Sequence, residues 1–251
     1  MRNKLFIQSL LMLSGILIFT SCGNTANNPS LKSPVQSSTD TTSSKTNREN
    51  GEHEANDNTN NASTPADAKI KTTENIQAAF KGETTASAKY AAYAQKAEKE
   101  GYHEIALLFK AASTAENIHA NNHKAVLQES GVQVALIKPE FTVKSTKENL
   151  EDAIAGETYE ASIMYPDFLT TANIAGDQLA LISLNYAYKT EKKHKVMYET
   201  ALIALQNNNV KSLPSIFYVC PTCGNTYDTK APARCGISMT FSQKFISINS
   251  L

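Results

Sequence analysis

The 251-residue sequence has no excess of charge of either sign, because 24 lysines and arginines are balanced by 24 aspartates and glutamates. A protein that binds nucleic acid needs a surplus of basic residues on one face, so we expect no nucleic-acid partner. The chain also has no tryptophan, an absence from which nothing follows. Its 41% content of hydrophobic residues is sufficient for a sizeable core and a small second domain.

A hydrophobic run long enough to cross a membrane is missing as well. The most apolar stretch, residues 5–19, is interrupted by Gln8 and Ser9, and it is shorter than the roughly 20 residues that a membrane-spanning helix needs. Its flanks indicate an export signal instead, because Arg2 and Lys4 precede the apolar stretch.

Thr20 and Ser21 lie directly before Cys22, and small residues before a cysteine resemble the cleavage box of bacterial lipoproteins. In such proteins the cysteine receives lipid and becomes the first mature residue. We therefore expect a lipoprotein signal peptide at residues 1–21 and an exported protein that lipidated Cys22 holds at the membrane of the bacterial cell envelope. An ordinary secretory signal with an incidental Cys22 is the alternative.

Large apolar residues are nearly absent from residues 22–70, which are rich in Ser, Thr, Asn, Lys and Glu. Such a segment cannot bury enough apolar surface to offset the entropy lost on ordering. The composition therefore predicts a disordered tether. His53 lies within it, and we expect a solvated histidine there rather than a metal ligand.

Two copies of one glutamate and histidine pattern follow the tether. In each copy a Gly-Glu-Thr triplet precedes a Glu-x-x-His pair by about 33 residues, and the copies are about 75 residues apart. Residues i and i+3 share one face of a helix, so each pair aims a carboxylate and an imidazole at one point. The first copy contains Glu83, Glu116 and His119, and the second contains Glu157, Glu191 and His194.

The midpoint of each copy carries a glycine that can end a helix in the left-handed conformation, Gly101 in the first copy and Gly176 in the second. Each copy is therefore predicted to be an antiparallel helical hairpin. Unpaired buried carboxylates cost several kcal/mol each, and two divalent metal ions would neutralise four of them. Four glutamates and two histidines match the two-metal sites of ferritin-like bundles. The alternative is that these residues lie on solvated faces by chance.

Apolar residues at helical spacing predict an all-α fold, with a ferritin-like four-helix bundle at residues 71–209. Gly131 and Pro139 mark a long crossover between the two hairpins, and Pro166 is expected to bend the third helix. The expected helices cover residues 71–100, 103–129, 145–175 and 177–207.

Five segments resemble rubrerythrin, in order, over about residues 75–246: KGETTASAKYAAYAQKAEKEGY, AENIHANNH, AGETYEASIMYPDF, TEKKHKVMYETAL and YVCPTCG. The resemblance extends to a break in the repeat, because the second Gly-Glu-Thr is followed by Glu160 where the first copy has Ala86. It implies a di-iron bundle with Glu160 as a seventh ligand, and the reduction of hydrogen peroxide to water.

The resemblance also implies a role for each ligand. Glu116 and Glu157 are expected to bridge the two iron ions. Glu83 and Glu191 are expected to be terminal ligands, and His194 is expected to stay on one iron in both oxidation states.

On the other iron, the resemblance implies that His119 in the reduced state is exchanged for Glu160 in the oxidised state. The extra carboxylate adds negative charge and so favours the oxidised ions. Tyr90 and Tyr165 match tyrosines that flank the site, where they could hydrogen-bond a ligand glutamate or the peroxide, or could simply pack between helices. His123 is expected beside the site or on the surface rather than on a metal.

The C-terminal residues 214–251 resemble a rubredoxin-like domain with one altered ligand. Cys220-Pro-Thr-Cys223-Gly resembles a first rubredoxin knuckle, whereas the second knuckle offers Cys235 and then Ser238 in place of a cysteine. Serine is a poorer ligand than thiolate. We favour an iron or zinc site made of three sulfurs with Ser238 or water. Loss of the site and a disulfide, from Cys220 to Cys223 or to Cys235, are the alternatives.

The resemblance thus implies an oxidoreductase, a non-haem di-iron peroxidase that defends the cell envelope against oxidative stress. Two iron ions are the expected cofactors, and manganese suits the same ligands. The expected partners are hydrogen peroxide, an electron donor that the sequence does not identify, the membrane and, as one option, a second copy of the chain in a homodimer. A non-catalytic metal-binding lipoprotein and a ferritin-like ferrous oxidase are the alternatives.

Overall fold

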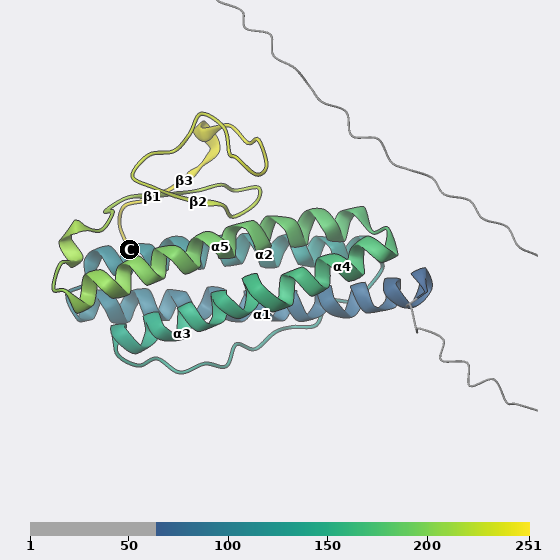
Figure 1. The fold of residues 1–251 in the computed structure, drawn as a ribbon, viewed down its shortest axis with the longest axis horizontal. Helices are drawn as coiled ribbons and strands as arrows, with labels where there is room; N and C mark the ends of the chain where they lie inside the picture. Colours follow the sequence, from purple (N-terminus) through teal and green to yellow (C-terminus); the bar gives the residue numbers. More distant parts are fainter. Residues whose placement is uncertain (1–63) are drawn as a thin grey trace, which may run out of the picture. The chain divides into compact units, whose positions relative to one another are not determined.

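The computed structural model describes residues 64–251, so the predicted signal peptide, Cys22, His53 and most of the predicted tether lie outside the described residues. The described residues form four helical rods and a small C-terminal sheet (Figure 1). The prediction of an all-α bundle with a small C-terminal strand region is confirmed. The helices are α1 (Pro65–Lys99), α2 (His103–Glu129), α3 (Thr146–Tyr159), α4 (Tyr165–Ala175) and α5 (Gln178–Gln206).

The start of α1 lies further toward the N-terminus than the predicted residue 71. Thr64 caps the helix, because its hydroxyl accepts a hydrogen bond from the backbone N–H of Asp67 at 3.2 Å while the Asp67 carboxylate accepts from Thr64. Pro65 occupies the first turn, where its missing N–H costs nothing. This capping box lies in polar sequence that composition alone assigns to the tether.

The third rod is interrupted where the sequence predicts a bend. A π-helical turn, η1 (Glu160–Met164), separates α3 from α4, and the N–H of Tyr165 bonds to the carbonyl of Glu160 five residues earlier. Pro166 follows directly and has no N–H with which to continue the regular ladder. Such single π turns are frequent at functional sites, and this one begins at a predicted ligand.

The turns and the crossover are as predicted. Gly101 and Gly176 adopt positive φ angles of 85° and 68° at the ends of the two hairpins. Residues 130–145 form a long connection without helix or strand. In the bundle, α1 packs along α2, α3 packs along α5, and α4 packs against both α1 and α5.

Two apolar clusters fill the bundle, one containing Tyr90 and Tyr198 and the other Ile76 and Leu184. On α1, Glu83 lies midway between Ile76 and Tyr90 in sequence, and the same order recurs on α5. The predicted ligand residues therefore form a polar layer between two apolar ends of the core.

The C-terminal sheet consists of β1 (Phe217–Val219), β2 (Thr226–Asp228) and β3 (Ile246–Ile248), in the order β2-β1-β3 with antiparallel pairing. It packs on α2 and α5 (Figure 1). The first knuckle, Cys220–Gly224, lies between β1 and β2, so the bundle contact of the sheet brings this knuckle close to both Glu-x-x-His helices. None of the helices within residues 64–251 is both long and apolar enough to span a membrane.

Candidate metal centre

Six of the seven predicted bundle ligands converge in the polar layer, from α1, α2, α3 and α5. All six side chains have exposed fractions of 1% or less. Their donor atoms form two overlapping groups, and within each group the atoms lie within 4.8 Å of one another. One group consists of Glu83, Glu116, His119 and Glu191, and the other consists of Glu116, Glu157, Glu191 and His194.

Glu116 and Glu191 face both histidines. Glu116 places Oε2 2.9 Å from Nδ1 of His119 and Oε1 3.1 Å from Nδ1 of His194. Glu191 places Oε1 2.9 Å from Nδ1 of His119 and Oε2 3.0 Å from Nδ1 of His194. Each carboxylate thus offers one oxygen to each of two metal positions, which is the arrangement of a bridging ligand.

This arrangement differs from the predicted roles of Glu157 and Glu191. Glu191 belongs to both groups and Glu157 to only one, so the shared ligands are Glu116 and Glu191. The reason is the pairing of α2 with α5. Each of these helices carries a Glu-x-x-His pair, so each glutamate faces its own histidine and the histidine of the other helix. Glu83 and Glu157 each belong to one group and would then be terminal ligands.

The six side chains fit a pair of metal ions better than a network of hydrogen bonds. Glu191 lies at ion-pair distance from both imidazoles, but neither of its oxygens makes a hydrogen bond to any described residue. Four other side chains of the site also have one buried polar atom each that makes no hydrogen bond to a described residue: Glu83, Glu116, Glu157 and His194. A buried polar group left unpaired costs about 1–3 kcal/mol. Two metal ions would give all these atoms a binding partner, and a ligand set of carboxylates and imidazoles suits iron or manganese.

Without metal, bound protons neutralise part of the buried negative charge. Burial, and then the repulsion of Glu116, raises the pKa of Glu83 to about 8. Burial opposes the charged form of the imidazoles, but the pKa of His119 is nevertheless raised by Glu191 and that of His194 by Glu116. The donor atoms that would hold metal are thus partly protonated near neutral pH in the metal-free protein.

We expect metal affinity to rise with pH between about 6 and 9, because each ion must displace protons from these groups. Protons bound at Glu83 compete with metal until the pH exceeds its pKa of about 8. Calorimetric titration with Co²⁺ in two buffers of different ionisation enthalpy should show net proton release at pH 7. An affinity that does not change over this pH range would contradict the raised pKa values.

The two predicted tyrosines lie against ligand carboxylates. Tyr90 donates a hydrogen bond to Oε1 of Glu157 at 2.8 Å, and Tyr165 donates to Oε1 of Glu83. Both hydroxyls are buried, and burial raises the pKa of each. They therefore act as hydrogen-bond donors that hold the terminal carboxylates in place, and at the same time they pack in the two apolar clusters.

His123 lies beside the site, which is one of its two predicted positions. It does not belong to either group of ligand atoms. Its Nε2 is 3.3 Å from the hydroxyl of Tyr165, and its Nδ1 is 2.8 Å from the hydroxyl of Ser183. Burial lowers the pKa of His123 to about 3, so the ring is neutral. Glu83, Tyr165, His123 and Ser183 thus form one hydrogen-bonded chain from the ligand layer to α5.

Glu160 is the predicted ligand that the structure does not bring into either group. It begins the π turn and is half-buried. Burial, and then the repulsion of Glu83 and Glu157, raises the pKa of Glu160 well above its usual range. Glu160 therefore lies close enough to the ligand carboxylates to interact with them, although its oxygens belong to neither group of donor atoms.

The three cysteines of the C-terminal domain are free thiols, which speaks against the alternative of a disulfide. They gather with their sulfur atoms within 4.8 Å of one another. Cys223 and Cys235 are 3.4 Å apart, and the hydroxyl of Ser238 is 3.2 Å from the sulfur of Cys220. A hydrogen bond from Cys223 lowers the pKa of Cys220 to about 4. The donor set fits one metal ion with three sulfurs and a serine oxygen.

The first knuckle and β2 contact the outer side of both ligand histidines. Nε2 of His119 donates to the carbonyl of Cys223 at 3.0 Å, and Nε2 of His194 lies 2.9 Å from the hydroxyl of Thr226. Gly224 lies against the His119 ring, where a Cβ atom would overlap Nε2 and approach Cδ2 to 2.8 Å. Gly224 and Thr226 could not be identified from the sequence, because no local spacing connects them with the bundle.

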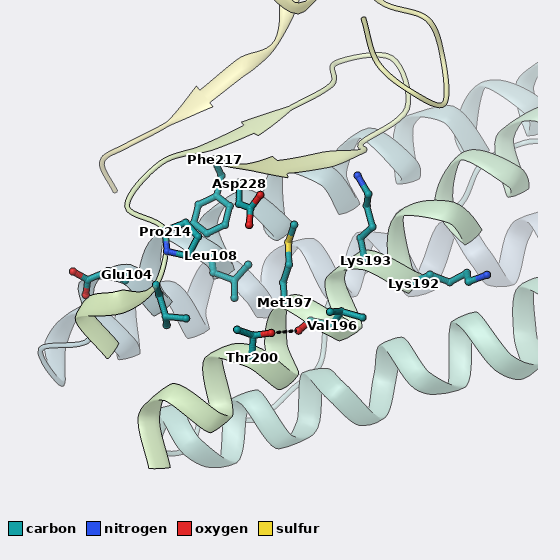
Figure 2. Close-up of a pocket in the computed structure, with 11 residues that line it drawn as sticks. Glu104, Leu108, Lys192, Lys193, Val196, Met197, Thr200, Pro214, Phe217 and Asp228 are labelled. Carbon is teal, nitrogen blue, oxygen red and sulfur yellow. Dashed lines mark hydrogen bonds between the residues drawn. The ribbon is translucent and has the colours of Figure 1, made fainter. Parts of the chain in front are cut away.

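A cavity of about 320 Å³ lies where α5 meets the sheet, lined by Met197 and Phe217 among others. Figure 2 shows Lys193 reaching from α5 toward the sheet at one side of this cavity. Its Nζ donates to Oδ1 of Asn225 at 2.8 Å and to the carbonyl of Thr226 at 3.3 Å. Lys193, the residue before His194, therefore fastens β2 to the helix that carries this ligand.

Four rods that converge carboxylates and imidazoles on two positions define a ferritin-like di-metal protein. The Rubrerythrin family model matches residues 74–202. The chain is 32% identical over 171 residues to rubrerythrin-2 of Clostridium acetobutylicum, covering 68% of this chain and 92% of that protein. It is 34% identical over 186 residues to nigerythrin of Nitratidesulfovibrio vulgaris, covering 72% and 89%. The chain belongs to the rubrerythrin family.

Solved structures lead to the same family. Nigerythrin in its fully reduced, all-ferrous state superposes with a TM-score of 0.63 at 30% identity, covering 77% of this chain and 91% of that chain. The mixed-valence state of nigerythrin also gives 0.63, at 32% identity, covering 70% and 86%. Bacterioferritin from Desulfovibrio desulfuricans gives 0.55 at 20% identity, covering 68% of this chain and all of that one, which shows a shared fold.

Proposed function

We propose that the protein is a di-iron peroxidase that reduces hydrogen peroxide to water. The observation that carries this proposal is the pair of carboxylates, Glu116 and Glu191, that each face two metal positions in a buried layer. Membership of the rubrerythrin family and the similarity to all-ferrous nigerythrin support iron as the metal. Two ferrous ions, when bound, supply the two electrons that cleavage of the peroxide O–O bond requires.

The residues of the chain would position the ions and the substrate. Glu83 and His119 would complete one position and Glu157 and His194 the other, with the two bridging carboxylates between them. The hydroxyls of Tyr90 and Tyr165 each donate their one hydrogen to a terminal carboxylate and so hold it in place. Because these side chains are almost fully buried, bulk water is kept away from the reacting oxygens.

Anaerobic rapid mixing tests the proposal. The iron-loaded, reduced protein is mixed with hydrogen peroxide in one experiment and with oxygen in another, and reoxidation is followed by the ferric absorbance. We expect reoxidation by peroxide to be much faster than reoxidation by oxygen. Slow reaction with both would favour metal storage, and fast reaction with oxygen would favour a ferrous oxidase.

We propose in addition that Glu160 is a seventh ligand, which takes the place of His119 in the oxidised state. The π turn supports this, because its irregular ladder allows Glu160 to change direction with little cost to α3 and α4. Glu160→Ala should slow reoxidation by peroxide at least tenfold and leave the melting temperature of the reduced protein nearly unchanged. Glu151→Ala, at an exposed position of α3, is the control. Unchanged peroxide kinetics would contradict this role.

We propose that the cysteine site binds iron or zinc through Cys220, Cys223, Cys235 and Ser238. Ser238→Cys should supply the fourth thiolate, because the serine oxygen already lies 3.2 Å from the sulfur of Cys220. With iron, this variant is expected to gain intense sulfur-to-iron absorption bands in the visible range. Ser247→Cys, on exposed β3, should not gain them. Their absence in Ser238→Cys would count against a folded metal knuckle.

The tether to the cell envelope through Cys22 stays a prediction from the sequence. The electron donor and the homodimer stay predictions as well. The gathered cysteines and the contact of the first knuckle with His119 support electron delivery through a metal ion in the C-terminal domain.

A further inference from the structure

Thr226 lies at the outer side of a ligand histidine and is fully buried. Its Oγ1 is 2.9 Å from Nε2 of His194 and 3.2 Å from the carbonyl of Gly224. A hydroxyl has one hydrogen to donate, and a carbonyl can only accept. The Thr226 hydroxyl therefore donates to Gly224, and its oxygen is left to accept the Nε2 hydrogen of His194.

We propose that Thr226 is a positioning residue that fixes Nδ1 of His194 as the metal-binding nitrogen. With the hydrogen on Nε2, a metal ion would bind at Nδ1, which faces the oxygens of Glu116 and Glu191 at 3.1 Å and 3.0 Å. This inference rests on metal occupancy of the bundle site, which is part of the proposed function, and not on peroxide reduction.

Both partners of the contact between Thr226 and His194 are fixed in position. On the strand, Lys193 fastens the neighbouring Asn225 and the carbonyl of Thr226 itself to α5. On the helix, the His194 ring is fully buried and cannot turn toward solvent. The carbonyl of Cys223 holds His119 in the same sense, because it too can only accept from Nε2. The C-terminal domain thus sets the orientation of both imidazoles, and Thr226 is the only side chain among the described residues that hydrogen-bonds Nε2 of either ring.

The variant Thr226→Val keeps the shape of the side chain and removes the acceptor. Loss of the outer hydrogen-bond partner of a ligand histidine weakens metal binding by about 10- to 100-fold. We therefore expect the Co²⁺ affinity of the bundle site in the full-length protein to fall by about this factor. Thr226→Ser, which keeps the hydroxyl, should restore the affinity. Thr200→Val is the matched control, because the Thr200 hydroxyl bonds only to the backbone of its own helix on an exposed face.

A second readout separates positioning from general loosening of the fold. In the zinc-loaded protein, the nitrogen-15 shifts of the histidine rings distinguish a ring bound through Nδ1 from one bound through Nε2. We expect wild type to bind through Nδ1 at both rings. In Thr226→Val the His194 signals should show mixed or exchanging states, whereas those of His119 should stay unchanged. Co²⁺–thiolate charge-transfer bands report the cysteine site separately and should not change.

The outcomes distinguish this inference from the proposed function. Thr226→Val with wild-type Co²⁺ affinity and an unchanged His194 signal would overturn the role of Thr226. Equal weakening in Thr226→Ser, or equal disturbance of His119, would overturn it too, since either result means a structural effect on the whole domain. If wild type itself binds no Co²⁺ in the bundle, the metal centre fails and the inference fails with it. A wild type that binds metal but does not react with peroxide would refute only the peroxidase.

Discussion

Replacing Glu191 by glutamine is expected to abolish binding of both bundle metals, whereas Glu157→Gln should abolish only one. Glu191 offers one oxygen to each metal position, at 2.9 Å and 3.0 Å from the two imidazoles, while Glu157 belongs to a single group of donor atoms. Glutamine keeps the volume of the side chain, so the loss is one of charge and donor atoms. Calorimetric titration with Co²⁺ measures the number of ions bound to the bundle of each variant.

The same substitution should also lower the stability of the protein when no metal is present. Glu191 is fully buried, and its oxygens lie at ion-pair distance from both imidazoles. Removing one partner of a buried charge pair costs roughly 3–5 kcal/mol, because the remaining charge is left uncompensated. We therefore expect metal-free Glu191→Gln to melt below metal-free wild type, and its melting temperature not to rise when metal is added.

Glu199→Gln is the control for these two measurements. Glu199 lies on the same helix but forms an ion pair with Lys195 in a partly exposed position, so its replacement should leave both metals bound. If instead Glu157→Gln lost both ions and Glu191→Gln lost one, the bridging role that the geometry gives to Glu191 would be wrong.

Sequence periodicity predicts which side chains of one helix face the same point, for a physical reason. An i, i+3 pair such as Glu116 and His119 shares a helix face whatever the helix packs against, so the donors of one helix can be assigned without knowledge of the fold. The internal repeat then brings in the matching pair, and glycines such as Gly101 end the helices where the turns must come. The bounds of α2 agree with the prediction for the same reason.

The position of Glu191 between the two histidines could not be predicted in this way, because it depends on contacts between helices. Which carboxylate spans two metal positions is decided by the pairing of α2 with α5 and by the direction of each side chain. The contact of His119 with Cys223 joins residues that are 104 positions apart. The start of α1 at Pro65 depends on a capping box of two residues, Thr64 and Asp67. The polar residues around this pair make the segment resemble the tether in composition.

Gly224→Ala is expected to disrupt the contact between the C-terminal domain and the metal centre. A Cβ atom there would overlap Nε2 of His119 and would lie 2.8 Å from Cδ2 and 3.1 Å from the carbonyl of Ala115. Neither neighbour can yield, since the ring is a buried ligand and the carbonyl belongs to α2. Overpacking costs roughly 1–3 kcal/mol. The φ angle of 75° adds roughly 1–3 kcal/mol for a residue other than glycine.

In Gly224→Ala, we expect either the C-terminal domain to detach from the bundle or the His119 ring to be displaced from the metal centre. Either outcome should lower the free energy of unfolding in urea, expose residues 207–216, which connect α5 with β1, to proteases and weaken Co²⁺ binding in the bundle. Gly236→Ala is a matched control in the same domain, because its Cβ would meet only the hydroxyl of Tyr227, at 3.7 Å. Were Gly224→Ala as stable and as protease-resistant as Gly236→Ala, the knuckle could not lie against His119, and the C-terminal domain would have no direct part in holding the ligand histidines.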